Sequence, residues 1–205
     1  MSSFRLRLAT PDDAAACLKI YAPIVSDTTI SFELDPPSID TMRERIVAKQ
    51  QSYPWLIAEQ VDGDGATATV VGYAYAGQWR ERIAYCWTVE LAVYVAPSSQ
   101  RTGVGKLLYT NLITLLRVQR FANAIAVISL PNDASIAFHH RHGFKTIGIF
   151  PRVGCKFDQW LDVAFLQLEL GQTHAKAAPQ PPRSVADSWL EWKQIIDDAN
   201  ANATR

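Results

Sequence analysis

The first residues of the chain alternate between apolar and polar side chains, which is the pattern of a half-buried strand. Segment 4–9 reads FRLRLA, with its apolar residues on one face and its two arginines on the other. A helix is predicted directly afterwards, because Thr10 can cap it and Pro11 suits its first position. The helical pattern continues over 14–21, and we expect it to stop at Pro23.

Further elements follow in the same half of the chain. A second helical pattern covers 38–50 and is opened by a Pro-Pro-Ser start signal. Segments 55–60 and 70–76 are rich in β-forming residues and flank the turn-forming loop 62–65, which predicts a hairpin. A third β-rich run covers 90–95 and ends before a proline.

The period of the pattern changes in the second half. Leucines recur every three or four residues over 103–120, which predicts a long amphipathic helix. Segment 124–130 is nearly all apolar, as expected for a strand that is buried on both faces. A short helix over 132–142 and strands at 144–150 and 163–170 complete the pattern. This order indicates an α/β or α+β domain built on a single sheet.

The composition changes after residue 170. We predict a domain over 1–170, a Pro/Ala-rich linker over 171–183, and a C-terminal amphipathic helix and tail over 184–205. We expect one apolar face of this helix to be covered, either by the chain's own core or by a partner. The residues of that face recur at intervals of three and four, and they are Val185, Trp189, Trp192 and Ile196.

Composition and charge exclude several classes of protein. The chain is 48% hydrophobic and 20% charged, which is too apolar for a disordered protein. Twenty basic and twenty acidic residues give a net charge of zero without dense basic runs, so a nucleic-acid partner is not expected. No apolar stretch has the length of a membrane helix, and the start of the chain lacks the apolar core of a signal peptide. Three cysteines without CxxC spacing predict neither a disulfide framework nor a zinc ribbon, so we expect a cytoplasmic protein.

Two glycines, Gly103 and Gly105, stand where a β-rich run gives way to the long helix. Backbone N–H groups at a helix start lack intrahelical acceptors and carry partial positive charge, so they can bind an anion. Glycine lets a phosphate approach this backbone, and Arg101 and Lys106 can add charge. The spacing matches neither the GxGxxG fingerprint nor a P-loop. A tight strand-to-helix connection without a ligand is the alternative.

The motifs around this turn resemble the GCN5-related N-acetyltransferase superfamily over roughly residues 4–170. They are Gln-Arg-x-Gly-x-Gly before the long helix, Asn-Asp-Ala-Ser after the buried strand, and His-Gly-Phe at 142–144. The resemblance implies a single mixed, mostly antiparallel twisted sheet flanked by helices, with acetyl-CoA as cosubstrate. Asn132 is also placed to cap the following helix, which is its alternative role. The residues that the resemblance assigns to coenzyme A are Val93, Tyr94 and Val95 for the pantetheine arm, Gln100, Arg101, Thr102, Gly103, Val104, Gly105 and Lys106 for the pyrophosphate, and Asn132 with Ser135.

A narrower resemblance is to the phosphinothricin acetyltransferase subfamily. It is carried by YAPIVSDTTISFE at 21–33, by Trp79-Arg80, and by KFDQWLD at 156–162. These enzymes acetylate the α-amino group of small amino acids such as phosphinothricin, methionine sulfoximine or methionine sulfone. The resemblance places Phe32, Trp79 and Arg80 in the substrate site and implies a homodimer. Arg80 suits a carboxylate or phosphinate, and an exposed, solvated arginine is its alternative.

An ammonium group cannot attack a thioester, so the reaction requires a proton acceptor. Glu90 interrupts an otherwise apolar run, and partial burial would raise its pKa toward a useful value. It also matches the general base that is proposed for the subfamily. A solvated carboxylate, or one paired with Arg80 or Arg82, is the alternative.

The proton donor to the leaving thiolate is harder to assign. Many members of the superfamily use a tyrosine at the position that His139 occupies here, and an imidazole can also donate a proton. A histidine with only a packing role is the alternative. His139 and His142 could share a helix face, but no nearby acid or cysteine completes a metal site, so we expect no metal.

The function that these observations predict is acetyl transfer from acetyl-CoA to the α-amino group of a small amino acid, by direct attack. An acetyltransferase for a polyamine or a protein N-terminus is one alternative. A polyamine site should be lined with acids, whereas Arg80 is the charged residue found here. A non-catalytic acyl-CoA-binding module is the other alternative, and the presence of Glu90 is the feature that argues against it.

Overall fold

The computed structural model describes residues 3–62, 67–171 and 179–203, and these residues contain one seven-stranded sheet. The strand order is β1-β2-β3-β4-β5-β7-β6, and only the β4–β5 pair is parallel. This confirms the predicted mixed, mostly antiparallel sheet. The strands are β1 (Ser3–Leu8), β2 (Trp55–Val61), β3 (Ala68–Gln78), β4 (Thr88–Val95), β5 (Asn123–Ser129), β6 (Lys145–Lys156) and β7 (Gln159–Glu169).

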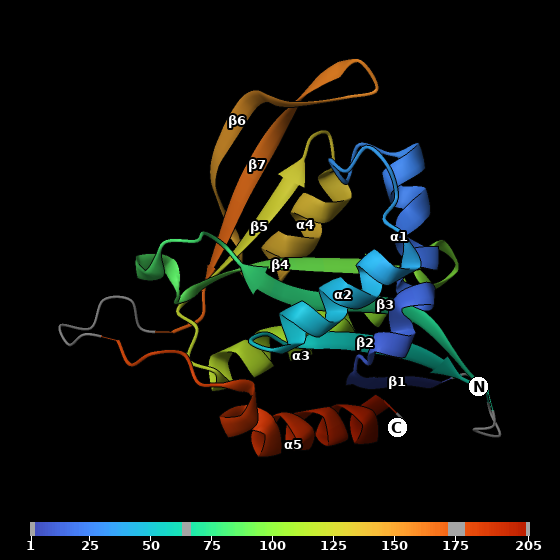
Figure 1. Cartoon of the computed structure of the whole chain (residues 1–205), viewed down its shortest axis with the longest axis vertical. Coiled ribbons are helices and arrows are strands. Elements are labelled where there is room, and N and C mark those ends of the chain that lie inside the picture. The colour runs from blue at the N-terminus through green and yellow to red at the C-terminus, as the bar shows by residue number, and fades with distance from the viewer. Residues whose placement is uncertain (1–2, 63–66, 172–178, 204–205) are drawn as a thin grey trace.

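Helices cover both faces of the sheet (Figure 1). Helices α1 and α2 pack on one face, and α3 packs on the other together with α4 and α5. None of the helices in the described residues has the length and apolar character needed to cross a membrane. The helices are α1 (Ala14–Asp27), α2 (Ile39–Gln50), α3 (Val104–Val118), α4 (Asp133–Arg141) and α5 (Val185–Ala203), with short 3-10 turns η1 (Pro11–Asp13), η2 (Ile83–Tyr85) and η3 (Pro97–Ser99).

The α3 face holds the larger core, because the leucine face of α3 lies against β1 to β4. Leu108, Leu112 and Leu116 are fully buried there, as the spacing of the leucines predicts. The face under α1 and α2 is built around aromatic rings. Trp55 and Tyr73 stack with their ring centroids 5.7 Å apart, so Tyr73 is a core residue rather than part of an open site.

Helix α1 does not end at Pro23, as the sequence pattern predicts, but continues to Asp27. Proline removes one backbone hydrogen bond, to the carbonyl of Lys19, and both residues lie on the exposed side of the helix. The carbonyl of Lys19 therefore faces water, which can replace the lost donor. Val25 is fully buried on the opposite side and holds the last turn against the sheet.

Strands β6 and β7 are longer than predicted and form a hairpin that extends beyond the other strands (Figure 1). Its turn contains Phe157 and Asp158, whose φ angles of 51° and 57° are both left-handed. Two consecutive left-handed residues make a tight hairpin turn whose twist matches that of the strands. The KFDQWLD motif therefore forms the tip of this hairpin, and the segment between the two predicted strands is itself β structure.

Helix α5 docks on α3 and β1. The indole N–H of Trp192 donates to the carbonyl of Leu115, and the amide of Asn200 bonds the backbone N–H and C=O of Leu6 at 2.6 and 2.9 Å. Trp192 and Ile196 lie on the docked face as predicted, but Trp189 does not, since 48% of it is exposed. Ser188 takes the inward position instead, because its hydroxyl is satisfied by the carbonyl of Ser184.

Parts of the predicted segments lie outside the described residues. These are positions 172–178 of the linker predicted over 171–183, positions 204–205 of the tail predicted over 184–205, and positions 1–2 and 63–66 of the domain predicted over 1–170, which include 63–65 of the loop predicted over 62–65. Strands β2 and β3 on either side of that loop do pair as an antiparallel hairpin, as predicted.

The docking of α5 predicts unequal effects of its two tryptophans. Trp192→Ala removes a fully buried ring and should lower the free energy of unfolding by about 3–5 kcal/mol. Trp189→Ala removes a half-exposed ring and should change it by about 0.5 kcal/mol or less. Urea denaturation followed by circular dichroism measures both values. Equal effects would contradict the docking of α5.

Candidate functional site

The sheet divides at the point where β4 and β5 separate. Their parallel ladder is three residue pairs long and ends with Glu90 opposite Ile125. Beyond it, β4 continues to Val95 along β3, while β5 continues along β7. Figure 1 shows β5, β6 and β7 diverging from β2, β3 and β4 from this point. We call this opening the fork.

The backbone of β4 presents hydrogen-bonding groups to the fork. The N–H of Ala96 donates to the carbonyl of Val71 in β3 at 2.8 Å, in the register of the β3–β4 pair. Because backbone direction alternates along an antiparallel strand, Tyr94 also bonds toward β3, and Val93 and Val95 point their N–H and C=O groups toward the fork. The ring of Tyr94 packs on the α1 side. Of the three predicted pantetheine residues, Val93 and Val95 are therefore the two whose backbone faces the fork.

The turn before α3 has the geometry of an anion-binding site. Arg101 and Gly103 both have left-handed φ angles, of 61° and 98°, so the chain turns sharply before the helix starts at Val104. Val104 is fully buried, so its side chain is not available to a ligand. A Cβ at Gly105 would lie 3.4 Å from the ring of Phe138, at the contact between α3 and α4. The exposed side chains of the turn are Gln100, Arg101, Thr102 and Lys106.

Asn132 is the N-cap of α4, because its Oδ1 accepts a hydrogen bond from the backbone N–H of Ser135 at 3.2 Å. The capping role weighed from the sequence is thus present. The Asn132 side chain is only partly buried, which leaves its amide nitrogen available. A contact of Asn132 and Ser135 with the cofactor stays a prediction.

His139 is a buried residue of α4. Its Nδ1 lies 2.8 Å from the carbonyl of Ser135, so Nδ1 carries a proton and Nε2 is the atom free to exchange one. The ring contacts Tyr109 and Phe144 edge-on, with centroids 5.2 Å away in each case. Burial lowers the pKa of His139, and the Ser135 carbonyl opposes this change. The imidazole is thus held mainly in its neutral form.

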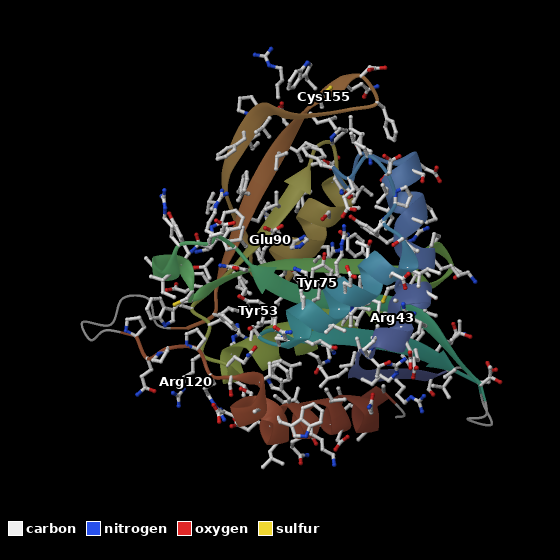
Figure 2. The ribbon with its side chains drawn as sticks, viewed as in Figure 1. Arg43, Tyr53, Tyr75, Glu90, Arg120 and Cys155 are labelled. Carbon is white, nitrogen blue, oxygen red and sulfur yellow. The ribbon has the colours of Figure 1, made fainter. Side chains whose placement is uncertain are left out.

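Glu90 lies on the opposite face of the sheet from α3. It pairs with Gly77 across the β3–β4 ladder, so both positions share the face that carries Tyr75. Figure 2 shows Glu90 where the two halves of the sheet meet, with Tyr75 beside it. The turn before α3 and the Glu90 carboxylate therefore belong to opposite faces of the sheet, and the fork lies between them.

Lys49 is a residue of this site that the sequence analysis missed. It lies in the last turn of α2, and its ammonium stands 5.0 Å from the centroid of the Tyr75 ring. Burial raises the pKa of the Glu90 carboxyl, while the cations of Lys49 and Arg80 oppose the rise. A signal was available, since Lys49 follows the buried Met42 and Ile46 at helical spacing.

Trp79 and Arg80 follow the end of β3 and lie together. The Arg80 guanidinium stands 4.6 Å from the centroid of the Trp79 ring, a cation–π contact that orients both side chains. The other contact of Trp79 is edge-on with Phe165 of β7, with centroids 5.8 Å apart. The structure thus brings Trp79, Arg80 and Glu90 to one face, and Trp79 reaches across the fork from one half of the sheet to the other.

Phe32 lies farther out, in the loop between α1 and α2. Its ring covers Gly154 of β6, where any added Cβ would overlap it. The loop is held there by the buried ammonium of Lys156, which donates to the carbonyls of Val25 and Ser31 at 2.6 and 2.7 Å. Phe32 is therefore fixed on the β6–β7 side of the face, and its contact with a substrate stays a prediction.

A pocket of about 500 Å³ lies between α5 and the turn before α3. Gly103, Lys106 and Thr110 of the turn and α3 form one wall, and Asp198 and Asn202 of α5 belong to the opposite wall. The C-terminal helix therefore borders the predicted cofactor turn. In the described residues, no three His, Cys, Asp or Glu side chains form a group able to hold a metal ion.

Comparison with protein families finds a match to the acetyltransferase (GNAT) domain over residues 6–165. A phosphinothricin N-acetyltransferase of Streptomyces viridochromogenes is 38% identical over 180 residues, which are 88% of this chain and 92% of that protein. An L-methionine sulfoximine/L-methionine sulfone acetyltransferase of Pseudomonas paraeruginosa is 36% identical over 174 residues, 84% of this chain and 98% of that protein.

Solved structures show the same likeness. A GNAT superfamily phosphinothricin acetyltransferase from Sinorhizobium meliloti, in complex with acetyl-CoA, superposes with a TM-score of 0.79 at 34% identity. The match covers 87% of this chain and 94% of that one. Helix α5 begins at Val185, beyond the last residue of the family match.

The burial of Glu90 predicts that its carboxyl titrates with a raised pKa. Nuclear magnetic resonance of labelled glutamate carboxyls should show that burial raises its pKa above the ordinary glutamate value, with Glu90→Gln identifying the signal. Lys49→Met removes an opposing cation and should raise the Glu90 pKa further. Since the folded chain then holds the proton at higher pH than the unfolded chain, stability falls as pH rises between the two pKa values. A midpoint at or below the ordinary value would contradict this account.

Proposed function

Since the chain belongs to the acetyltransferase (GNAT) family, we propose that it transfers an acetyl group from acetyl-CoA to the α-amino group of a small amino acid, with Glu90 as the general base. The single observation that carries this proposal is the place of Glu90. Its carboxylate stands on the α1 face at the end of the β4–β5 ladder, where the two halves of the sheet separate, and burial raises its pKa.

The reaction removes two protons from the acceptor nitrogen and delivers one to the leaving sulfur. The acceptor ammonium first gives a proton to Glu90, which frees the lone pair of its nitrogen. The nitrogen then attacks the thioester carbonyl, the new C–N bond forms, and the C–S bond breaks. The nitrogen loses a second proton, which is passed to the departing thiolate to form the thiol of coenzyme A, while the first proton stays on Glu90 until it is released to water.

The fork and the turn before α3 suit the two parts of coenzyme A. The N–H and C=O groups of Val93 and Val95 face the fork, where an extended amide-containing arm can lie beside β4 as a further strand would. The backbone from Gln100 to Lys106, with two left-handed residues and the start of α3, suits a pyrophosphate. Asn132 and Ser135, at the start of the helix whose Phe138 lies against Gly105, are proposed to complete the cofactor site.

His139 is proposed as the proton donor to the thiolate. Its Nδ1–H is fixed on the Ser135 carbonyl, so Nε2 must first be protonated and then donate. The lowered pKa of His139 makes such a cation a strong acid, and a short-lived one.

The acceptor is proposed to be an amino acid whose side chain ends in an oxygen-rich group, such as methionine sulfone, methionine sulfoximine or phosphinothricin. Two relatives are named for these substrates. Arg80 offers a bidentate cation to such an end group, Trp79 holds that cation in place, and Phe32 is proposed to lie against the side chain. The cations beside Glu90 argue against a polyamine acceptor.

The three cysteines are all free thiols in the structure. Free thiols are typical of proteins in reducing compartments. Cys17 is fully buried, and burial raises the pKa of its thiol to about 12, so it is inert. We propose on this basis that the enzyme works in the cytoplasm.

The role of Glu90 is tested by Glu90→Gln. Turnover with methionine sulfone should fall by roughly 10²–10⁴, because the amide cannot accept the proton. The affinity for acetyl-CoA, measured by calorimetry, should not change, since the cofactor groups lie elsewhere. Near-normal turnover would remove Glu90 from the mechanism, and acetylation of spermidine or a peptide in place of amino acids would overturn the acceptor class.

A homodimer is proposed from the surface of the β6–β7 hairpin. Strand β6 is an edge of the sheet, and an uncovered edge with apolar side chains favours association. A second copy that covers this surface would shield it. The exposed apolar residues of the hairpin are Ile147, Ile149, Phe150, Val153, Phe157 and Trp160.

Charge placed on this surface should separate the protomers. Light scattering should give twice the chain mass of 22.8 kDa for the wild type and the chain mass for a variant with Ile149→Glu and Trp160→Glu. Leu190→Glu is the matched control, since Leu190 is 80% exposed on α5. A wild-type monomer at all concentrations would exclude the dimer, and dissociation by Leu190→Glu would place the interface on α5.

A further inference from the structure

The ammonium of Lys49 occupies the space that a side chain at Gly77 would take. A Cβ built on Gly77 would lie 2.5 Å from Lys49 Nζ, and its next nearest neighbour would be the adjoining Cε at 3.8 Å. The missing side chain of Gly77 therefore makes room for this cation on the floor of the site. The same ammonium lies over the ring of Tyr75, 5.0 Å from its centroid.

This position puts Lys49 beside the proposed base. Gly77 and Glu90 are directly opposite in the β3–β4 register, so a group above Gly77 neighbours the Glu90 side chain. In the described part of the chain, Lys49 nevertheless forms no ion pair with a carboxylate. A partly buried ammonium without an ion-pair partner is available to an anion.

The covalent structure of an α-amino acid matches this pair of charges. Its amino and carboxyl groups share one carbon atom, so a site that holds the amine at a base must hold the carboxylate within a few ångströms of that base. An ammonium is a compact charge with three rotatable donors, which suits a carboxylate approached from several directions. Arg80, the other cation that acts on Glu90, is then left for the side-chain end.

We propose that Lys49 binds the α-carboxylate of the acceptor, and that this contact selects free amino acids over amines that lack a carboxylate beside the nitrogen. The inference rests on the proposed function and names the residue that recognises the α-carboxylate, which all free α-amino acids share. A peptide N-terminus has an amide at that position and a polyamine has a methylene group, so neither offers an anion to Lys49.

A matched pair of acceptors isolates this contact. Methionine sulfone and its carboxamide differ only in the charge of the α-carboxyl group, so the ratio of their kcat/KM values reports on the group that recognises it. Comparing this ratio between variants cancels the different basicities of the two amines. A residue that only supports the fold would lower both kcat/KM values and leave the ratio unchanged.

Four variants complete the design. Lys49→Gln removes the cation, and Gly77→Ala displaces it, because the added methyl group occupies its place while the flexible lysine can move aside. Both should lower the acid-to-amide ratio by roughly 10- to 100-fold, the range for a hydrogen bond to a charged group. Lys49→Arg retains a cation and should lower the acid-to-amide ratio less than Lys49→Gln does. Arg80→Ala should lower kcat/KM for acid and amide alike, which leaves the ratio near that of the wild type.

The outcomes separate this inference from the function on which it rests. A lower acid-to-amide ratio of kcat/KM in Lys49→Gln and Gly77→Ala supports the role of Lys49, provided that calorimetry shows unchanged acetyl-CoA affinity. If the wild type acetylates methionine sulfone and both variants keep its ratio, the role of Lys49 is wrong and the proposed function stands. If the wild type acetylates neither acceptor while binding acetyl-CoA, the proposed acceptor class is wrong, and the role of Lys49 falls with it.

Discussion

Three residue pairs hold β4 to β5, and every part of the candidate site is placed by the end of that ladder at Glu90. A longer ladder would occupy the backbone of Val93 and Val95, and no edge would be left for an extended ligand. A shorter one would let the two halves of the sheet drift apart. Because β5 also pairs with β7 over its full length, the fork opens without exposing a weak strand. The opening is therefore a rigid feature of the sheet rather than the product of a mobile loop.

The two halves of the sheet are also tied together across the fork. Lys156 at the end of β6 donates two hydrogen bonds to the carbonyls of Val25 and Ser31, which belong to α1 and the loop after it. The hydroxyl of Ser129 in β5 donates to the carbonyl of Thr29 in the same loop at 2.5 Å. Burial lowers the pKa of the Lys156 ammonium, and nearby Glu33 opposes this. A lysine in the KFDQWLD motif thus serves to fix the loop that carries Phe32, a structural reason for a motif first noticed through resemblance.

Features that depend on the local residue pattern can be predicted from the sequence. The position of a side chain that depends on a residue distant in the sequence cannot. The strands, the leucine face of α3 and the turn at Gly103 follow from period and backbone preference, and the structure contains them. Spacing alone selected Trp189 for the docked face of α5, but Ser188 lies there because its hydroxyl is satisfied within the helix. Lys49 escaped notice for a similar reason. Helical spacing in α2 puts Lys49 on the buried side, but its role also depends on the absent side chain of Gly77, 28 positions away, which spacing within α2 does not indicate.

The side chains and the backbone groups of strand β4 point in different directions. Its side chains at Glu90 and Tyr94 point to the α1 face, while the backbone groups of Val93 and Val95 point along the sheet into the fork. The proposed base and the first of these backbone groups are three residues apart, which is roughly 10 Å along a strand. An acceptor amine, an acetyl group and the start of the pantetheine arm have to fit within that span. The pitch of a β-strand, which no side-chain rearrangement can change, therefore sets the distance between the two halves of the proposed reaction.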